Sequence, residues 1–275
     1  MRARSRPRGH ASPAWRRALA IEIEGIAREA GVEIVGFGDV QSALPADFHH
    51  LPVGISLGVV HPAVRSLQLL PEGRPTAEIE RALCDHRDRH GQVVLEKALR
   101  DLADYLRSRG YRYFCCPPEV DPMESPFTAL MVRRFSHKAA ATCAGVGWVG
   151  RHGLLNHPAY GPHVTFATLV TNAPLDPAEP VVRSECGTCR SCVDACPAGA
   201  ITGRPWSRDD GMVSLVDADR CRRVLAENAR TTGRWFCGRC ALACAGARRN
   251  AGERTQGGPP AGEWPVGDGA SSRQK

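Results

Sequence analysis

The sequence predicts an α/β domain followed by a small cysteine-rich domain. Two observations support this fold class. Segments typical of strands alternate with helical segments up to about residue 180, and eight of the 12 cysteines lie between Cys186 and Cys244. The 275 residues, 43% of them hydrophobic, suffice for one large domain or two modest ones. The 28 glycines and 21 prolines indicate many turns rather than a helical bundle.

The first predicted element is a helix that follows a basic tail. Residues 1–11 are rich in Arg, Pro and Ser, and we expect them to be disordered. Ser12 and Pro13 resemble an N-cap followed by proline at the first helical position. Apolar residues then recur on one helical face from Trp15 to Ile26, and Gly31 is expected to end the helix.

Strands are predicted over residues 32–37 and 53–60, the second being more apolar and therefore more buried. Residues 76–109 contain no proline and are predicted to form a long amphipathic helix, because leucines recur at spacings of four, three and four at Leu95, Leu99, Leu102 and Leu106. Residues 111–115 follow as a strand. This succession of strand, helix and strand is typical of an α/β layer with right-handed crossovers.

Two further elements complete the predicted domain. Residues 136–144 form an alanine-rich helix and residues 164–170 a last apolar strand. The next segment, residues 172–180, contains three prolines and is predicted to be a linker. The expected organisation is thus a basic tail (1–11), an α/β domain with a cofactor or substrate site (12–180), a cysteine-rich domain (181–248) and a disordered tail (249–275).

The cellular compartment determines whether the cysteines are expected to form disulfides or to bind metal. The chain has no run of 18 apolar residues, which excludes a transmembrane helix and a membrane partner. Arg16 and Arg17 could begin an export signal, but Glu22 and Glu24 follow where such a signal is uncharged, so a cytoplasmic location is favoured. Thiols stay reduced there, which favours metal or redox chemistry over disulfides. The net charge of +7 is discounted as a nucleic-acid signal, because six arginines lie in the first 17 residues.

The first cysteine group has the spacing of bacterial ferredoxins, in the run Cys186-x2-Cys189-x2-Cys192-x3-Cys196-Pro197. Three thiolates two residues apart can wrap one four-iron cluster, while the fourth reaches a second cluster. Zinc is the competing interpretation. It is disfavoured because zinc sites use two cysteine pairs with a longer spacer between them.

The second group consists of Cys221, Cys237, Cys240 and Cys244, so that eight thiolates serve two [4Fe-4S] clusters with none left over. Cys221 lies 16 residues upstream of its group, which indicates a ferredoxin pattern with one stretched loop. The predicted ligand sets are Cys186, Cys189, Cys192 and Cys244 for one cluster, and Cys196, Cys221, Cys237 and Cys240 for the other.

The remaining cysteines are interpreted as small core hydrophobes rather than ligands; they are Cys84, Cys115, Cys116 and Cys143. His86 and His90 stand four residues apart on the predicted long helix and could clamp a metal. Their charged neighbours favour a solvated helix face instead.

A further motif lies upstream of the clusters, in the segment from Phe135 to Leu155, FSHKAAATCAGVGWVGRHGLL. Together with the cysteine framework, this segment resembles the epoxyqueuosine reductase family and its iron–sulfur relatives, the reductive dehalogenases. The resemblance is firm over residues 135–244 and looser over residues 32–130. It implies a nitroreductase-like α/β domain followed by a two-cluster ferredoxin-like domain.

In that family the α/β domain binds a cobalamin and the ferredoxin-like domain feeds it electrons one at a time. The resemblance therefore implies a cobalamin or substrate site near Gly147, Trp148, Gly150 and Arg151, where glycines would let the backbone approach a large flat ligand. The simpler alternative is a glycine-rich turn between helix and strand, with Trp148 in the core.

The sequence also departs from the family. The tRNA-modifying members carry an acidic proton donor about thirteen residues before the Ala144-Gly145 pair, where this chain has the basic segment 131–134. A reductive dehydroxylation needs an acid beside the reacting centre. His137, Lys138 or Glu124 could replace it. The C-terminal helical-repeat extension of those enzymes has no counterpart here, so this is a short form.

Three functions follow as hypotheses. The favoured one is an iron–sulfur oxidoreductase that reduces a small molecule or a corrinoid in its α/β domain, with a ferredoxin or flavodoxin as electron donor. The second is a non-enzymatic electron carrier that docks a partner reductase. The third is an epoxyqueuosine reductase acting on tRNA, which the missing acid and extension disfavour.

Overall fold

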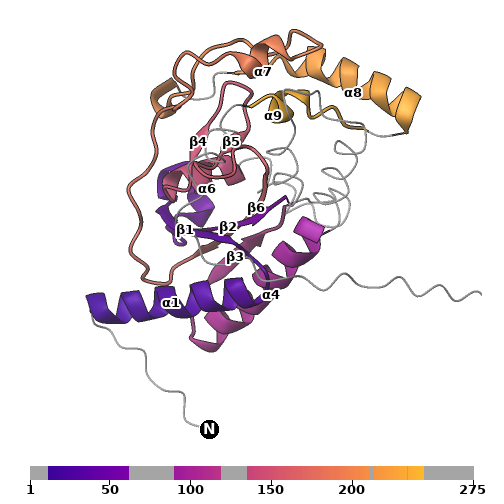
Figure 1. Ribbon diagram of the computed structural model, residues 1–275. Helices are drawn as coiled ribbons and strands as arrows, with labels where there is room; N and C mark the ends of the chain where they lie inside the picture. Colours follow the sequence, from indigo (N-terminus) through magenta and orange to yellow (C-terminus); the bar gives the residue numbers. More distant parts are fainter. Residues whose placement is uncertain (1–11, 62–89, 119–134, 211–213, 234, 245–275) are drawn as a thin grey trace, which may run out of the picture.

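A computed structural model of the protein describes residues 12–61, 90–118, 135–210, 214–233 and 235–244 (Figure 1). The predicted tails, residues 76–89 of the predicted long helix, and Glu124 lie outside the described residues. Cys84 and His86 do so as well. Among the residues that are described, no helix is both long and apolar enough to cross a membrane.

A four-stranded sheet forms the centre of the α/β part. Its spatial order is β1 (Ile34–Asp39), β2 (Val53–Val60), β6 (Val164–Thr171) and β3 (Tyr113–Cys116). Every neighbouring pair is antiparallel. The strands β2 and β3 both run opposite to β6 and hence parallel to each other, with α4 (Gln92–Ser108) between them in sequence. The predicted succession of strand, helix and strand thus joins two parallel strands, and β6 from much later in the chain lies between them.

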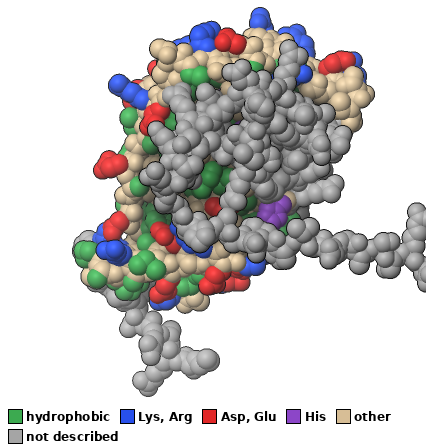
Figure 2. All heavy atoms as spheres, in the orientation of Figure 1, with side chains coloured by type: hydrophobic (Ala, Val, Ile, Leu, Met, Phe, Trp, Pro, Cys, Tyr) green, Lys and Arg blue, Asp and Glu red, His purple; other side chains and the backbone are tan. Residues whose placement is uncertain are grey.

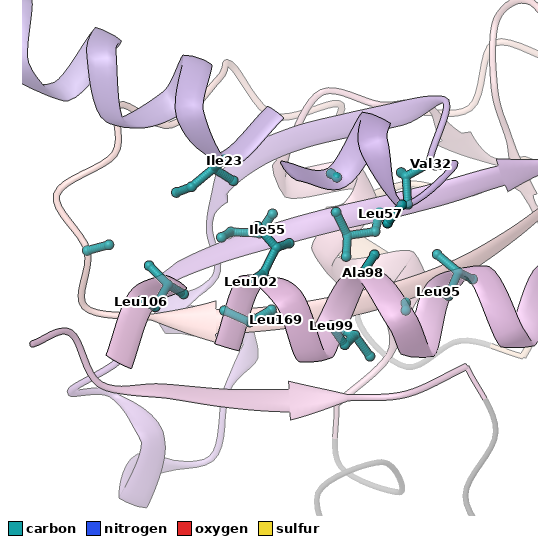
Figure 3. Close-up of a cluster of buried hydrophobic side chains, with 14 of the residues drawn as sticks. Ile23, Val32, Ile55, Leu57, Leu95, Ala98, Leu99, Leu102, Leu106 and Leu169 are labelled. Carbon is teal, nitrogen blue, oxygen red and sulfur yellow. The ribbon is translucent and has the colours of Figure 1, made fainter. Parts of the chain in front are cut away.

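One face of the sheet is covered by α4 and by α1 (Pro13–Glu29), as Figure 1 shows. Ser12 caps α1 as predicted, its side chain accepting the N–H of Trp15, and Gly31 follows the helix at a φ of 101°. The four periodic leucines of α4 are all buried, and they meet Ile55, Leu57 and Leu169 of the sheet (Figure 3). Burying a leucine side chain contributes about 1.5–3 kcal/mol, so this layer dominates the stability of the domain.

The opposite face carries α6 (His137–Cys143), which begins at the N-cap Ser136 as the sequence predicts. Its close approach depends on glycines in β1. A Cβ added at Gly38 would lie 2.5 Å from the Ala144 nitrogen, and one at Gly36 would lie 2.6 Å from Val146. Glycine in a strand is typical where another backbone approaches closely. Two short 3-10 helices, η1 (Gln41–Ala43) and η2 (Ala46–Phe48), connect β1 to β2.

The two-stranded hairpin of β4 (Trp148–Val149) and β5 (Leu155–Asn156) follows α6. In Figure 1, α6 and this hairpin lie between the sheet and the cysteine-rich segment. That segment contains α7 (Ser191–Asp194), η4 (Arg208–Asp210), α8 (Ala218–Thr232) and α9 (Arg239–Leu242). Residues 172–180 contain neither helix nor strand, and Ala173 and Leu175 at their start are buried in the core of the α/β domain; the linker stays a prediction.

Candidate iron–sulfur site and adjoining cavity

The cysteine-rich segment has two similar halves, each built around a short helix. Cys192 lies on α7 and Cys240 on α9, and these two helices pack against each other. Each half begins with a Cys-Gly-x-Cys turn in which the glycine has a positive φ, 53° at Gly187 and 67° at Gly238. Glycine adopts that backbone conformation without steric penalty. The stretched loop between the halves forms α8, which carries Cys221.

Burial and neighbouring thiols raise the pKa of three of the eight cysteines, Cys192, Cys240 and Cys221. Burial raises the pKa of Cys192 to about 11, and the thiols of Cys244, Cys186 and Cys189 raise it further. Burial likewise raises the pKa of Cys240 to about 12; among the thiols Cys237 has the largest effect, followed by Cys192 and Cys196. The pKa of Cys221 is raised by burial, Cys237 and Cys196. We call Cys186, Cys189, Cys192 and Cys244 the outer set, and Cys196, Cys221, Cys237 and Cys240 the inner set.

The outer and inner sets are the two ligand sets that the spacing predicts, and both this division and the role of each thiol as an iron ligand stay predictions. Among the described residues, no three His, Cys, Asp or Glu side chains converge as tightly as a single metal ion requires. A four-iron cluster carries its thiolates on separate corners of a cubane, which places them further apart than around one ion. Two sets of four thiols have the donor chemistry that such clusters use.

Two arginines join the cysteine-rich segment to the α/β domain. Arg151 donates to the carbonyl oxygens of Gly187, at 2.6 Å, and of Gly203. Arg208 reaches in the opposite direction, to α6, where it donates to the hydroxyl of Thr142 at 2.9 Å. Charge-assisted bonds of this kind are roughly twice as strong as neutral ones, so the two arginines fix the segment from both sides.

A cavity of about 680 Å³ lies between the two parts of the chain. The α/β domain contributes residues from α6, from the hairpin and from the start of β6. The cysteine-rich segment contributes Trp235 and Phe236, the apolar pair before Cys237, and all four cysteines of the inner set. None of the outer set lines it. A mainly apolar concavity with a few polar groups is typical of a cofactor or substrate site.

Two buried histidines supply polar groups to this cavity. His152 accepts the N–H of Leu154 at Nδ1, so its Nε2 carries the proton, while His163 bonds through its ring to the carbonyl of Ala241. Neither Nε2 atom has a partner within the described chain. Burial lowers the pKa of each to about 4; His163 and Lys138 lower that of His152 further. The cavity wall thus holds two neutral imidazoles, one with a free donor and one with a free acceptor.

The three candidate proton donors differ in availability. His137 lines the cavity, but both of its ring nitrogens are bonded, to Thr168 Oγ1 at 2.9 Å and to the Pro117 carbonyl at 3.0 Å. Lys138 also lines the cavity, and its ammonium donates to the Gly153 carbonyl at 2.9 Å. Burial lowers the pKa of Lys138, which makes it a better acid than an exposed lysine. Glu124 lies outside the described residues.

The four residues predicted to contact a cofactor have protein neighbours instead of an open space. A Cβ at Gly147 would lie 2.0 Å from the Asn156 carbonyl oxygen, and one at Gly150 would lie 2.4 Å from Asn156 Nδ2. These glycines therefore allow the hairpin to close. Trp148 is half-buried in the same hairpin, and Arg151 holds the cysteine loop; none of the four lines the cavity. Their contact with a cofactor stays a prediction.

The residues that sequence reasoning missed here are His152 and His163. They flank glycine and proline in turns, where no periodic pattern singles them out. The one available sequence signal was the position of His163, a titratable residue directly before a buried strand. Many residues without a functional role occupy such positions. Their approach to each other depends on the tertiary fold, which brings both to the cavity wall.

Comparison with known proteins first defines the class. Residues 185–247 match the family described as the 4Fe-4S dicluster domain. The fold and the eight thiols together define an iron–sulfur protein in which such a domain follows an α/β domain. In sequence the chain resembles the epoxyqueuosine reductases. It is 40% identical to that of Synechococcus sp. (strain CC9605) over 111 residues, which cover 37% of this chain and 32% of the relative.

A second relative, the epoxyqueuosine reductase of Bacillus subtilis (strain 168), is 39% identical over 108 residues, which cover 39% of this chain and 25% of the relative. The matched segments thus span about a third or less of these relatives' own length. The predicted resemblance to epoxyqueuosine reductase-like iron–sulfur proteins is confirmed at that level.

Solved structures extend the likeness to the whole fold. An epoxyqueuosine reductase crystallised with a modified tRNA stem loop superposes with a TM-score of 0.57 at 20% identity, covering 86% of this chain and 67% of the other. A reductive dehalogenase described in connection with B12-dependent dehalogenation gives 0.59 at 17% identity, covering 90% of this chain and 35% of the other. The predicted fold class, an α/β domain followed by a ferredoxin-like domain, is confirmed.

Proposed function

We propose that the protein is an iron–sulfur oxidoreductase in which two four-iron clusters carry electrons, one at a time, to a small molecule or corrinoid bound in the cavity. The observation that carries this proposal is that the inner set of cysteines lines the cavity while the outer set does not. Electrons then pass from the outer cluster to the inner cluster and on to the cavity. The inner cluster is the one adjacent to the reacting molecule.

The outer set is also the one that an electron donor can approach. Gly187, Thr188 and Arg190 surround the outer cysteines, and all three are exposed. A small donor protein such as a ferredoxin or flavodoxin could dock there without entering the cavity. If the donor transfers one electron each time it docks, two such transfers supply the two electrons that a reductive cleavage requires.

The protein supplies a proton and a bounded space for that reaction. Lys138 is the proposed proton donor, because it faces the cavity and burial makes its ammonium more acidic. The mainly apolar walls, including Trp235 and Phe236, bound the space around the reacting groups. His152 and His163 would hold a polar group of the bound molecule by donating one hydrogen bond and accepting another.

The cavity fits a corrinoid in chemistry: its walls are mainly apolar, as a flat macrocycle requires, and its two unpartnered imidazole nitrogens match the donor and acceptor of a peripheral carboxamide. A bound corrinoid would supply a cobalt centre able to cleave a carbon–oxygen or carbon–halogen bond reductively. The residues that would hold it are His152, His163 and the apolar wall.

Two measurements test this function. Anaerobically reconstituted protein should contain close to eight iron atoms and eight acid-labile sulfides per chain, and a count of four would contradict the two-cluster arrangement. Titration of the holoprotein into cob(II)alamin should change the cobalamin spectrum. No change there, with eight iron atoms present, would favour the alternative of an electron carrier that docks a partner reductase.

A second candidate, reduction of epoxyqueuosine in tRNA, is favoured by one observation, the similarity to a reductase solved with a tRNA stem loop. Against it, arginines of α8 are paired with acids on the same helix or its cap, at Arg220 with Asp217, Arg222 with Asp219 and Arg230 with Glu227. Figure 2 shows both signs of charge interspersed along this edge. An assay of epoxyqueuosine-containing tRNA for conversion to queuosine decides between the two candidates.

A further inference from the structure

The β4–β5 hairpin contacts the outer set through the side chain of Asn156. Cys244 Sγ lies 3.6 Å from Oδ1 of Asn156, and the thiol donates to that amide oxygen. Asn156 is only 1% exposed and stands at the end of β5, opposite Trp148 in β4. A buried amide of this kind is held in place by its hydrogen bonds, so the contact is part of the fixed architecture.

Iron ligation would turn the Cys244 sulfur from a hydrogen-bond donor into an acceptor. A cysteine that binds iron does so as a thiolate, which has no proton to donate and only accepts hydrogen bonds. The amide oxygen would then face the thiolate as a second acceptor. Because the oxygen and nitrogen of an asparagine amide are almost equal in size, a half-turn of the amide places Nδ2–H against the sulfur in the same space.

We infer that Asn156 donates an N–H···S hydrogen bond to Cys244 when the outer cluster is in place, and so acts as a positioning residue that sets the reduction potential of that cluster. The inference rests on the proposed function, in that it takes Cys244 as a ligand of the outer cluster. It adds a determinant of electron flow that lies in the α/β domain, outside the cysteine-rich segment.

The local backbone supports this role. The carbonyl of Asn156 passes so close to Gly147 that a Cβ there would lie 2.0 Å away, and a Cβ at Gly150 would lie 2.4 Å from the Asn156 side-chain amide nitrogen. These glycines admit Asn156 between the turn and the cysteine loop. The Gly-x-x-Gly pattern of residues 147–150 thus has a physical purpose: it brings a hydrogen-bond donor from the α/β domain to the iron–sulfur site.

The expected effect on the cluster follows from charge. A reduced cluster carries one more negative charge than an oxidised one, so a donor to its sulfur stabilises the reduced form and raises the potential. The inner set has a donor of its own, the N–H of Ala200, which lies 3.3 Å from Cys196 Sγ. Removal of the Asn156 donor should therefore lower the potential of the outer cluster and leave that of the inner cluster nearly unchanged.

The first test is a redox titration of the holoprotein, followed by electron paramagnetic resonance. In Asn156→Asp, which keeps the shape but replaces the donor with a negative charge, one of the two cluster potentials should shift to a more negative value. Asn172→Asp is the matched control, because the Asn172 amide oxygen accepts the Arg112 N–H on the far side of the sheet. It should leave both potentials as in the wild type.

A second measurement does not depend on any variant assembling its clusters. Wild-type protein grown with asparagine labelled by ¹⁵N at the side-chain amide should show a ¹⁵N hyperfine coupling to one reduced cluster in pulsed paramagnetic resonance. The coupling should persist in Asn228→Asp, which removes the amide that donates to the Phe236 carbonyl beside the inner set.

The outcomes separate the inference from the function on which it rests. Eight iron atoms with no ¹⁵N coupling, or with unchanged potentials in a fully loaded Asn156→Asp protein, would overturn the inference and leave the two-cluster function intact. An iron count of four in the wild type would instead contradict the two-cluster function. A ¹⁵N coupling together with a negative shift confined to one cluster would establish the bond.

Discussion

Arg208 and Thr142 connect the cysteine-rich segment to the α/β domain: the Arg208 guanidinium donates to the Thr142 hydroxyl at 2.9 Å. The same guanidinium donates to Cys143 Sγ at 3.2 Å and to the Val181 carbonyl at 3.4 Å. One side chain of η4 thus bonds helix α6 and the backbone at Val181, just after the predicted linker. Loss of this side chain should lower the stability of the protein and shift the position of the iron–sulfur site.

Replacement of this arginine should destabilise the protein. We expect Arg208→Ala to lower the free energy of unfolding by about 2–3 kcal/mol, because hydrogen bonds to charged groups contribute about 1.5–3 kcal/mol and their buried acceptors are left unpaired. Denaturant unfolding of the holoprotein measures this. Arg222→Ala, which removes an exposed pair with Asp219 at 3.2 Å, should change the value by less than about 0.5 kcal/mol. Equal effects of the two changes would contradict the role of Arg208.

Gly147→Ala should be among the most damaging small substitutions. The added methyl group would lie 2.0 Å from the Asn156 carbonyl oxygen, so the hairpin must move, and overpacking of this kind costs about 1–3 kcal/mol or more. Gly25→Ala is the control: the added Cβ meets nothing within 4 Å inside α1, and alanine should stabilise the helix by about 0.5–1 kcal/mol. In thermal unfolding, the melting temperature should fall for Gly147→Ala and rise for Gly25→Ala. A fall of the same size in both variants would contradict the backbone contact.

Acidification should weaken the fold through the two cavity histidines. Burial lowers the pKa of both His152 and His163 to about 4, so the folded state resists a proton that the unfolded chain accepts near pH 6.5. Their contribution is complete above about pH 6.5 and is lost as the pH falls toward 4, at about 2 kcal/mol per histidine between pH 7 and pH 5.

The measurement is the difference in free energy of unfolding between pH 7 and pH 5, for the wild type and for a His152→Gln, His163→Gln double variant. The double variant should lose less stability on acidification, because glutamine does not titrate. His50→Gln, at an exposed position, should behave as the wild type does. A double variant that loses as much as the wild type would show that the buried imidazoles are not held neutral.

The division of the cysteines into outer and inner sets predicts which cluster each substitution removes. Cys221→Ser should cost about half of the iron and leave a paramagnetic signal from the outer cluster, whereas Cys244→Ser should leave the signal of the inner one. Cys116→Ala, a buried cysteine of β3 outside both sets, should retain the full iron content. If Cys221→Ser and Cys244→Ser leave the same signal, the division is wrong.

Much of the local structure could be predicted because it is encoded locally. The leucine spacing of α4 repeats with the period of a helix, and the apolar run of β2 is typical of a buried strand. The cysteine spacing follows from the geometry of a cubane. Strand neighbours could not be predicted in this way, since β6 pairs with β2 across more than 100 residues of sequence. The function of Arg151 was missed for the same reason: its partners Gly187 and Gly203 lie in another part of the chain.

The placement of Cys221 on α8, between the two halves of the cysteine-rich segment, has a consequence for biosynthesis. Both sets of thiols draw on residues beyond 236, and a nascent chain that ends there offers only five of the eight. Cluster insertion must therefore follow the release of nearly the whole segment from the ribosome, whereas the α/β domain, complete by about residue 180, can fold first. The folded domain would then present Arg151 and Asn156 as a surface on which the late segment and its iron assemble.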